Sequence, residues 1–563
     1  MNNVLEYLEK SARKYPHKTA VIDENCSCTY EELMEDTVTI GNNLREIDRL
    51  CTKNYDYIEQ CNSSRSFGFD EQHSLGTNKE ENCNKQKHSP AVVVFMDKSV
   101  KTLKAFMGIV YYGGFYSLVD PSFPISRIQQ IFDILGPCCV ITNAKNRNIL
   151  NEIDYNGCIC DIDELLVKNE GTCSYDMGND ISSNMRNAIS ANIGNNMNGN
   201  NLRPLYCNFT SGSTGVPKGV LISHKSVISF IDNFVDTFGI DSNDVIGNQA
   251  PFDFDVSVKD IYSCLKTGAT LVIIPKSYFM FPNKVMDMLD KYKVTTLIWA
   301  VSALVMINRL KGLMYKTPSS INKIMFSGEV MPIKQLNKWR EYYPKAMFVN
   351  LYGPTEITCN CTYYIVDRYY NEYGGLPLGR PFAHNKVYLF DKNNNVILKN
   401  MVDKKGEICV CGDGLAIEYI NNKSATDKAF VTMSINGENV RLYKTGDLAS
   451  YGADGYMYYE GRKDFQIKHM GHRIELEEIE NVLGNVPVVE QACCFFDEDK
   501  NKIVAYIVGI DNKREIIEHM KRRVPEYMVP NIFRHVDRMP LNKNGKTDRK
   551  LLKTLYKEGC NKN

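Results

Sequence analysis

Short apolar runs of strand length alternate along this chain with segments of helical periodicity. The clearest runs are rich in β-branched and other large apolar residues, which is typical of buried strands. They are Ala91–Phe95, Ala269–Ile274, Thr296–Trp299 and Lys323–Phe326. The stretches between them have the character of crossover helices. This alternation predicts α/β domains with layered, mostly parallel sheets.

Two polar segments interrupt this alternation of apolar runs and helical segments. Residues 52–89 are polar with few large aliphatic side chains, and residues 177–201 are rich in Asn, Gly and Ser. Neither buries enough apolar surface to offset its ordering entropy, so we expect two mobile surface insertions. The segment Met1–Lys10 predicts an amphipathic helix with Val4, Leu5 and Leu8 on one side. Its charges argue against a signal peptide.

Composition narrows the possible classes of protein. With 563 residues, 43% of them hydrophobic, the length predicts two to four domains. Lys+Arg and Asp+Glu both number 67, so no net charge favours nucleic acid or an acidic membrane. No apolar run approaches the roughly 18 residues of a membrane helix. The 19 cysteines fall in adjacent or one-apart pairs without C-x-x-C metal spacing, and we expect reduced thiols in a cytoplasmic enzyme.

One loop combines the groups that bind polyphosphates. Residues 208–219, Asn-Phe-Thr-Ser-Gly-Ser-Thr-Gly-Val-Pro-Lys-Gly, bring hydroxyls, glycines and a lysine together. Glycines allow close backbone approach, and hydroxyl and N–H groups donate to phosphate oxygens. On composition alone the loop is equally a Ser/Gly-rich surface turn. It lacks the P-loop pattern G-x-x-x-x-G-K-[ST], because Lys218 follows Pro217 and precedes Gly219.

The loop resembles the phosphate-binding motif of adenylate-forming enzymes, and the rest of the chain resembles that superfamily in order and spacing. The further matching motifs are Thr29–Leu33, Asp120–Arg127, Asn350–Glu356, Gly406–Gly412, Tyr443–Leu448, Gly461–Asp464, Gly471–Glu475 and Asn544–Arg549. The resemblance implies a large domain over residues 1–463 and a small α+β domain over residues 464–563. It also implies that the small domain rotates about Asp464 between two half-reactions.

The same resemblance assigns nucleotide contacts. Tyr352 is expected on the adenine face, Asp447 on the ribose hydroxyls and Glu356 on Mg²⁺, while Lys546 would swing into the site. The implied catalytic residues are Lys546, Thr210, Lys218 and Glu356. The implied ATP- and AMP-binding residues are Thr210, Ser211, Gly212, Ser213, Thr214, Gly215, Lys218, Gly328, Glu329, Asn350, Tyr352, Gly353, Thr355, Asp447, Arg462 and Lys546.

Within the superfamily, Phe252–Val258 resembles the branch that activates amino acids. There Asp255 would pair with the substrate's α-ammonium, whereas an enzyme for fatty acids would bury an unpaired carboxylate at a cost of several kcal/mol. The spacing from Ala250 to Tyr262 is similar to D-alanine–D-alanyl carrier protein ligases. The expected substrate-pocket residues are Asp255, Val256, Lys259, Ala303, Met325, Ser327, Leu351, Cys359 and Asn360.

Lys259 departs from the resemblance, because this position is usually apolar or tryptophan. It is either an exposed i,i+4 partner of Asp255 or a cation that recognises a carboxylate- or amide-bearing side chain. Nothing after Arg549 resembles a phosphopantetheine site, so a carrier protein is expected in trans. The leading hypothesis is an ATP- and Mg²⁺-dependent ligase that activates an amino acid and loads a carrier thiol. An acyl-CoA synthetase and a non-catalytic ligand-binding relative remain alternatives.

Overall fold

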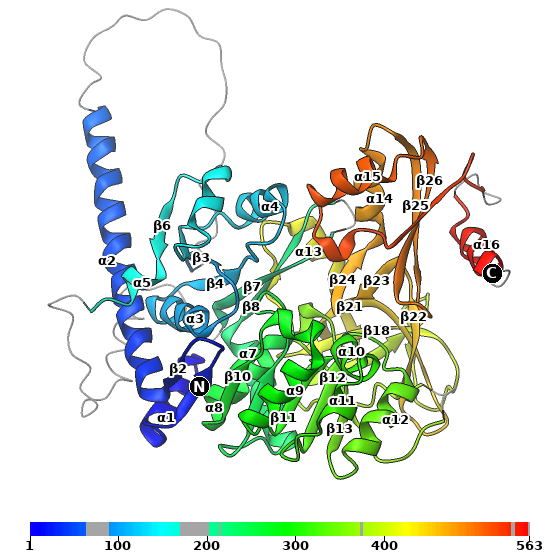
Figure 1. Cartoon of the computed structure of the whole chain (residues 1–563), viewed down its shortest axis with the longest axis horizontal. Helices are drawn as coiled ribbons and strands as arrows, with labels where there is room; N and C mark the ends of the chain where they lie inside the picture. Colours follow the sequence, from blue (N-terminus) through cyan, green and yellow to red (C-terminus); the bar gives the residue numbers. More distant parts are fainter. Residues whose placement is uncertain (64–88, 169–201, 213–214, 372–374, 542–546, 561–563) are drawn as a thin grey trace, which may run out of the picture.

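The computed structural model describes residues 1–63, 89–168, 202–212, 215–371, 375–541 and 547–560. They form two large sheets with helices, an antiparallel sheet and a C-terminal α/β unit (Figure 1). Within these residues no helix is both long and apolar enough to cross a membrane. The mixed α/β class expected from the sequence is therefore observed.

The N-terminal sheet has seven strands in the order β19-β8-β7-β4-β3-β5-β6. Strands β7, β4, β3, β5 and β6 are parallel, and β8 and β19 continue the sheet antiparallel. The bounds are β3 Ala91–Phe95, β4 Phe115–Leu118, β5 Cys139–Thr142, β6 Cys158–Asp161, β7 Pro204–Thr210, β8 Lys218–Ser223 and β19 Glu418–Tyr419. Its helical segments are α2 Tyr30–Ser63, α3 Val100–Tyr112, α4 Ile125–Leu135, η1 Arg147–Glu152 and α5 Ile162–Leu165.

The second sheet has nine strands in the order β15-β14-β13-β12-β11-β9-β10-β1-β2. The bounds are β1 Thr19–Ile22, β2 Ser27–Thr29, β9 Val245–Asn248, β10 Thr270–Ile273, β11 Thr296–Ala300, β12 Lys323–Ser327, β13 Met347–Tyr352, β14 Thr362–Ile365 and β15 Arg380–Pro381. The six strands from β13 to β1 are parallel. Its helical segments are α1 Leu5–Lys14, α7 His224–Phe238, α8 Val256–Thr267, η3 Lys276–Met280, α9 Pro282–Lys291, α10 Val301–Arg309, α11 Gly312–Tyr315, α12 Ile333–Tyr342 and η4 Thr355–Ile357.

Helices α7 and α8 belong to one hydrophobic core with residues of both large sheets. Local sequence sets their ends. Ser223 caps α7 by accepting from the Ser226 amide, and Gly239 ends the helix in the left-handed conformation. Gly268 ends α8 in the same way. Asp255 directly precedes α8, so the helix start holds the predicted ammonium-binding carboxylate.

The third sheet is antiparallel and follows the two large ones in the chain. Its order is β17-β16-β18-β21-β20, with β22 paired to β21. The bounds are β16 Asn385–Phe390, β17 Val396–Ile397, β18 Gly406–Gly412, β20 Phe430–Ile435, β21 Glu438–Tyr451 and β22 Met457–Arg462, with helix α13 at Lys423–Ala429. Strands β21 and β22 carry the predicted ribose residues Asp447 and Arg462 to the site.

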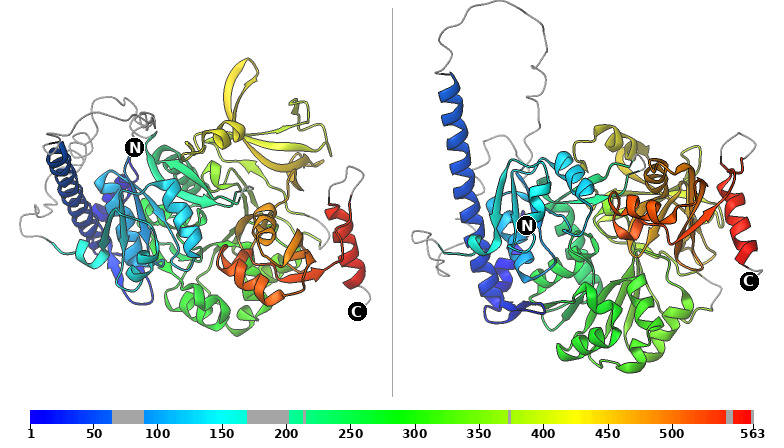
Figure 2. Two further views of the ribbon diagram at one scale, coloured as in Figure 1. Left: turned by 90° about the horizontal axis from the view of Figure 1, so that it is seen from above. Right: turned by 45° about the horizontal axis from the view of Figure 1, so that its top comes forward.

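The C-terminal unit has its own core, and it lies above the nine-stranded sheet and beside the seven-stranded one (Figure 2, right). Its elements are β23 Gln466–His469, β24 His472–Glu475, α14 Leu476–Gly484, β25 Val489–Asp497, β26 Lys502–Gly509, α15 Lys513–Lys521, η5 Glu526–Met528, β27 Ile532–His535 and α16 Arg549–Cys560. Among the described residues, the hydrophobic clusters of the large sheets end at Met457, and those of this unit begin at Ile467. Asp464 lies in the gap between them.

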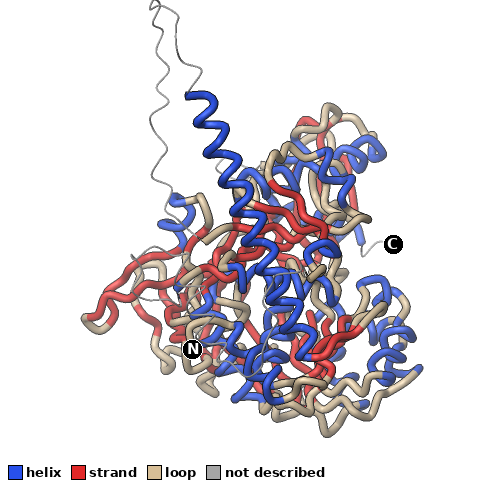
Figure 3. Tube along the Cα trace, turned by 90° about the vertical axis from the view of Figure 1, so that its left-hand side faces the viewer, coloured by secondary structure: helices blue, strands red, loops and turns tan. Residues whose placement is uncertain are grey.

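The four predicted strands are confirmed as β3, β10, β11 and β12, with bounds that differ by one residue at most. The N-terminal helix is also present, and Val4, Leu5 and Leu8 are buried. The first predicted insertion is partly wrong, because α2 continues to Ser63 as one long helix that rises past the sheets (Figure 3). Residues 64–88 and the insertion at 177–201 lie outside the described residues.

Candidate active site

Polar residues converge where the parallel strands of both large sheets end. Thr210 is the last residue of β7, Ser327 ends β12, and Tyr352 ends β13. Ligands of open α/β sheets bind outside the carboxyl ends of the strands, because successive loops meet there. These three strand ends carry the predicted phosphate, side-chain and adenine contacts.

The phosphate loop is covered by the small C-terminal unit. The Ser211 hydroxyl donates to the Arg473 carbonyl at 2.8 Å and accepts from the Glu475 amide at 3.0 Å. The Gly212 amide donates to the Glu478 carboxylate at 3.2 Å. Thr210 and Lys218 face each other across the β7–β8 hairpin, and Gly215 has a positive φ of 82°. Ser213 and Thr214 lie outside the described residues.

Glu356, the predicted Mg²⁺ ligand, is buried in η4. Its Oε1 accepts from the Tyr419 hydroxyl and its Oε2 pairs with the Arg473 guanidinium, both at 2.7 Å. Burial by itself raises the pKa of this carboxyl, but Arg473 and the Tyr419 hydroxyl outweigh it and leave the pKa below its ordinary value. Glu356 is therefore ionised and has a protein cation as its partner.

The predicted ribose carboxylate belongs to a chain of short hydrogen bonds that reaches the predicted hinge. Asp447 Oδ2 accepts from the Tyr352 hydroxyl and Oδ1 pairs with Arg462, both at 2.6 Å. Arg462 also pairs with Asp464 at 2.7 Å. Gly446 has a φ of 74°, and a side chain there would meet the Arg462 guanidinium at 2.7 Å. Only glycine fits this approach.

The other predicted nucleotide-binding residues differ in their surroundings. Gly328 follows β12 with a φ of 96°, and Glu329 accepts from the Gly471 amide of the small unit at 2.7 Å. The Asn350 amide donates to the Pro377 carbonyl, so this side chain has a structural partner. Thr355 is buried, and its hydroxyl acts to lower the pKa of the Asp255 carboxyl. Lys546 lies outside the described residues.

Lys259 is wholly buried, so its interpretation as an exposed helix residue is wrong. Its amine donates to the Asn360 side-chain oxygen at 2.7 Å and to the Ser327 hydroxyl at 3.3 Å. Both partners are themselves predicted pocket residues. The expected i,i+4 ion pair with Asp255 does not form. Burial lowers the pKa of Lys259 below its ordinary value, although Cys359, Asp255 and Asp260 act in the opposite direction.

A strained loop completes this pocket. Thr358 and Cys359 have positive φ values of 55° and 70°, which is costly for residues with side chains. The Thr358 hydroxyl donates to the Gly414 carbonyl and the Cys359 thiol to the Asp255 carbonyl, at 2.8 and 3.0 Å. A side chain on Gly353 would meet the Asn360 Cα at 2.5 Å. These contacts hold Asn360 against Lys259.

The remaining predicted pocket residues are all buried. Met325, Leu351 and Cys359 share one hydrophobic cluster, and Val256 opens α8 beside Asp255. Ala303 belongs to a separate cluster formed with α9 and α12. The structure thus joins Asp255, Lys259, Ser327, Cys359 and Asn360 by contacts but does not join Ala303 to them.

Sequence reasoning missed four charged residues of the site. Lys468 is half-buried with its amine 5.8 Å from the Tyr352 ring centre, and desolvation lowers its pKa while Asp447 and Asp255 act in the opposite direction. Arg473 holds Glu356, and Arg127 pairs with Glu478 at 2.7 Å across the two domains. Arg127 and Arg473 lie inside motifs of the family resemblance, which could have pointed to them. The resemblance by itself assigns no role to either residue.

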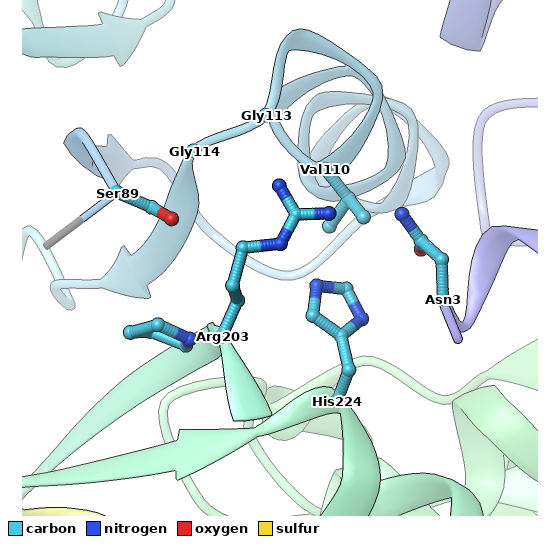
Figure 4. Close-up of a pocket in the computed structure, with 8 residues that line it drawn as sticks. Asn3, Ser89, Val110, Gly113, Gly114, Arg203 and His224 are labelled. Carbon is cyan, nitrogen blue, oxygen red and sulfur yellow. The ribbon is translucent and has the colours of Figure 1, made fainter. Parts of the chain in front are cut away.

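A separate small pocket lies away from this site. Asn3, Ser89, Gly114, Arg203 and His224 are among its lining residues (Figure 4). Arg203 and Pro204 stand at the start of β7, whereas the site stands at its end. Burial lowers the pKa of His224 to about 3, so this imidazole is neutral. The pocket has no contact with the phosphate loop or with Lys259 among the described residues.

None of the cysteines that the structure describes forms a disulfide, and most are buried. The sequence has no C-x-x-C metal spacing, but the fold brings three of its cysteines together. Cys139, Cys158 and Cys160 bring their sulfur atoms within 4.8 Å of one another. They gather because β5 and β6 are neighbours, which C-x-C spacing alone does not reveal.

Comparison with known proteins agrees with this geometry. The AMP-binding enzyme model matches residues 82–420, and the AMP-binding enzyme C-terminal domain matches residues 478–546. The D-alanine–D-alanyl carrier protein ligase of Bacillus licheniformis is 32% identical over 83% of this chain and 89% of its own length. Bacitracin synthase 1 of the same species is 31% identical over 82% of this chain, which spans only 8% of that protein.

Solved structures share the fold. The Vibrio cholerae adenylation domain AlmE, in complex with glycyl-adenosine-5'-phosphate, has a TM-score of 0.76 at 18% identity and covers 99% of this chain and 98% of its own. The family model spans more than half of the present chain. On the strength of that match and of the ligase relative, this chain belongs to the AMP-binding enzyme family of AMP-forming ligases.

Proposed function

We propose that this chain uses ATP to activate an amino acid as an aminoacyl adenylate and then loads the phosphopantetheine thiol of a separate carrier protein. In the first step a substrate carboxylate oxygen bonds to the α-phosphorus, and the bond to pyrophosphate breaks. In the second step a thiolate attacks the acyl carbon, and AMP leaves. The names of the ligase relatives, which join an amino acid to a carrier protein, support this assignment.

The observation that carries the proposal is the Asp255 carboxylate. It is 6% exposed, and burial raises its pKa, while Lys259 and the Thr355 hydroxyl act in the opposite direction. Within the described residues it forms no ion pair. A buried carboxylate without a cation costs several kcal/mol. The α-ammonium of an amino acid would offset that cost, whereas a fatty acid or CoA-activated acid would not.

The two half-reactions would use different arrangements of the domains 1–463 and 464–563 about Asp464. Glu356, the predicted Mg²⁺ ligand, has both oxygens engaged by Tyr419 and Arg473 here. Mg²⁺ would have to share that carboxylate with a guanidinium, so the residues in this arrangement do not fit the ion. We therefore assign the described arrangement to thioester transfer. Lys546 would serve adenylate formation after the small domain turns.

ATP–pyrophosphate exchange tests the proposal across the twenty common amino acids, D-alanine and β-amino acids, with fatty acids as the contrast. One or more amino acids should support exchange, and Asp255→Asn should raise the amino-acid KM at least tenfold while ATP binding persists. The matched control is Asp260→Asn, another buried carboxyl on α8, which accepts from Asn248. Exchange with fatty acids alone, or equal effects of both variants, would contradict the proposal.

A further inference from the structure

The Lys259 amine is a buried charge that the protein leaves without a counter-ion. Its two hydrogen-bond partners, Asn360 and Ser327, are neutral. Lys259 is 0% exposed, and no carboxylate of the described residues pairs with it within 4 Å. The groups that face it are Asp255 at the start of its helix, Asp260 on the helix and Cys359 on the strained loop. Asp260 instead accepts from the Asn248 amide at 2.7 Å.

A lysine buried without a counter-ion destabilises the fold unless a ligand supplies the opposite charge. A buried ion without a partner loses several kcal/mol of hydration, and neutral acceptors recover only part of it. An ordinary core would place an apolar side chain here. The strained backbone at Thr358 and Cys359 holds Asn360 in place as an acceptor for this amine. The surrounding structure is therefore arranged to bind the Lys259 ammonium.

We infer that Lys259 binds the side-chain carboxylate of the substrate, and that the substrate is an α-amino acid with an acidic side chain. This inference rests on the proposed function. Asp255 and Lys259 lie one helical turn apart on the same helix face, about 6 Å along its axis. A zwitterionic amino acid with a second carboxylate presents an ammonium to Asp255 and an anion to Lys259. It thereby neutralises both buried charges at once.

Neutral substrates would leave one of these charges unpaired. Alanine has no group that reaches the amine. Glutamine and asparagine offer an amide oxygen but no negative charge, so they replace only a hydrogen bond. Discrimination at a buried polar site is strong because the wrong substrate leaves a group unpaired. We expect kcat/KM for the acidic amino acid to exceed that of its amide analogue by roughly a hundredfold or more.

The test is ATP–pyrophosphate exchange with aspartate, glutamate and 2-aminoadipate, each against its amide, and with alanine. The parent enzyme should prefer one of the diacids. Lys259→Met should abolish that preference and favour apolar amino acids, with ATP binding retained. Lys266→Met is the matched control, since Lys266 lies on the same helix but pairs with Asp232. It should leave the ranking unchanged.

The outcomes distinguish a failure of the acidic-substrate inference from a failure of the proposed function. Exchange supported by neutral amino acids, with diacids inactive in the parent, overturns the acidic-substrate inference and leaves amino-acid activation standing. Exchange with no amino acid overturns the proposed function itself. The order in which the parent enzyme prefers the amino acids tests the inference even if Lys259→Met fails to fold. An unchanged ranking in a folded Lys259→Met variant likewise overturns the inference.

A second inference comes independently from the three thiols on β5 and β6. Cys139 Sγ lies 3.4 Å from Cys160 Sγ, which lies 3.6 Å from Cys158 Sγ. Cys139 and Cys160 are buried, and Cys158 is half-buried on the edge strand β6. Thiolates at 2.3 Å from a tetrahedral Zn²⁺ are about 3.8 Å apart. The three sulfur atoms therefore already have nearly the spacing of zinc ligands.

We propose that Cys139, Cys158 and Cys160 bind a thiophilic divalent ion such as Zn²⁺, with a water in the fourth position. Binding would release three protons, because each thiol must ionise to become a ligand. The site is separate from the phosphate loop, since β6 is the outermost strand of its sheet. Its role would be to fasten this edge strand to β5.

Cd²⁺ titration of the fully reduced protein, followed by its ultraviolet thiolate-to-metal absorption, tests this site. Cys160→Ser should remove one tightly bound equivalent that the parent holds. Cys207→Ser, which removes a buried thiol outside the cluster, should not. Equal Cd²⁺ binding by parent and Cys160→Ser would refute the metal site. A disulfide among the three cysteines in protein purified without reductant would also refute it.

Discussion

The ion pair between Arg127 and Glu478 should control how the two domains are arranged. Arg127 Nη1 lies 2.7 Å from Glu478 Oε1, with side chains 6% and 2% exposed. The pair joins α4 of the large domain to α14 of the small one, and Glu478 also accepts from the Gly212 amide. In the domain movement that we propose, undocking of the small domain would return both ions to water. Glu478→Gln therefore affects the docked arrangement far more than the undocked one.

The size of the effect follows from burial. Removing one partner of a buried pair costs about 3–5 kcal/mol. Glutamine keeps the shape of the side chain and one acceptor, so we take the loss of docking free energy as about 3 kcal/mol. This loss lowers the ratio of docked to undocked molecules roughly 150-fold. From a parent ratio of about 10, the docked share would fall below a tenth. Thioester transfer should then drop at least tenfold, while pyrophosphate exchange persists.

Hydrogen exchange measured by mass spectrometry reads the docked ratio directly. A docked-to-undocked ratio of about 10 slows exchange about elevenfold, so protection of the Gly212 amide and of the β24 amides next to Ser211 should fall roughly tenfold in Glu478→Gln. Glu480→Gln is the matched control, because Glu480 likewise accepts from an arginine, Arg549, and from a backbone amide, but within the small domain. Unchanged protection in Glu478→Gln, or an equal loss in both variants, would refute this account of domain docking.

Three further predictions concern the two half-reactions. Lys546→Ala should abolish adenylate formation and leave ATP binding within a few-fold of the parent, and exchange activity within threefold of the parent would exclude its role. Asp464→Pro should spare pyrophosphate exchange in part and abolish thioester transfer, because proline fixes φ at the pivot. Asp464→Ala is its control, because it removes the side-chain contacts with Arg462 and with the Gln466 amide but leaves φ free. Equal losses in both half-reactions would mark a structural residue. Since the pKa of Glu356 is lowered overall in the folded protein, its ion pair with Arg473 stabilises the docked arrangement above the ordinary glutamate pKa. That stability should be lost as the pH falls through the lowered pKa. Arg473→Met should flatten this loss in hydrogen exchange measured from pH 7 to 3, and an identical pH profile would contradict the assignment.

The sequence by itself determined the local structure and the order of the motifs. Uninterrupted apolar runs such as Ala91–Phe95 fold as strands because neighbouring strands and helices bury both of their faces. The family followed from motifs that are contiguous in the chain, such as the phosphate loop and Asn350–Glu356. Local pattern misled for α2, since this helix includes the twelve residues 52–63, which composition predicts to be part of an insertion.

Only the tertiary structure decided which charges meet. Lys259 joins Asn360 across 101 positions and Arg473 joins Glu356 across 117, and no local pattern encodes such pairs. Helical spacing placed Lys259 next to Asp255 and suggested an exposed ion pair. Packing between the two sheets buried the lysine instead, because α8 lies inside a shared core. The acidic-substrate inference and the domain arrangement both depend on burial and long-range contact, which exist only in the folded chain.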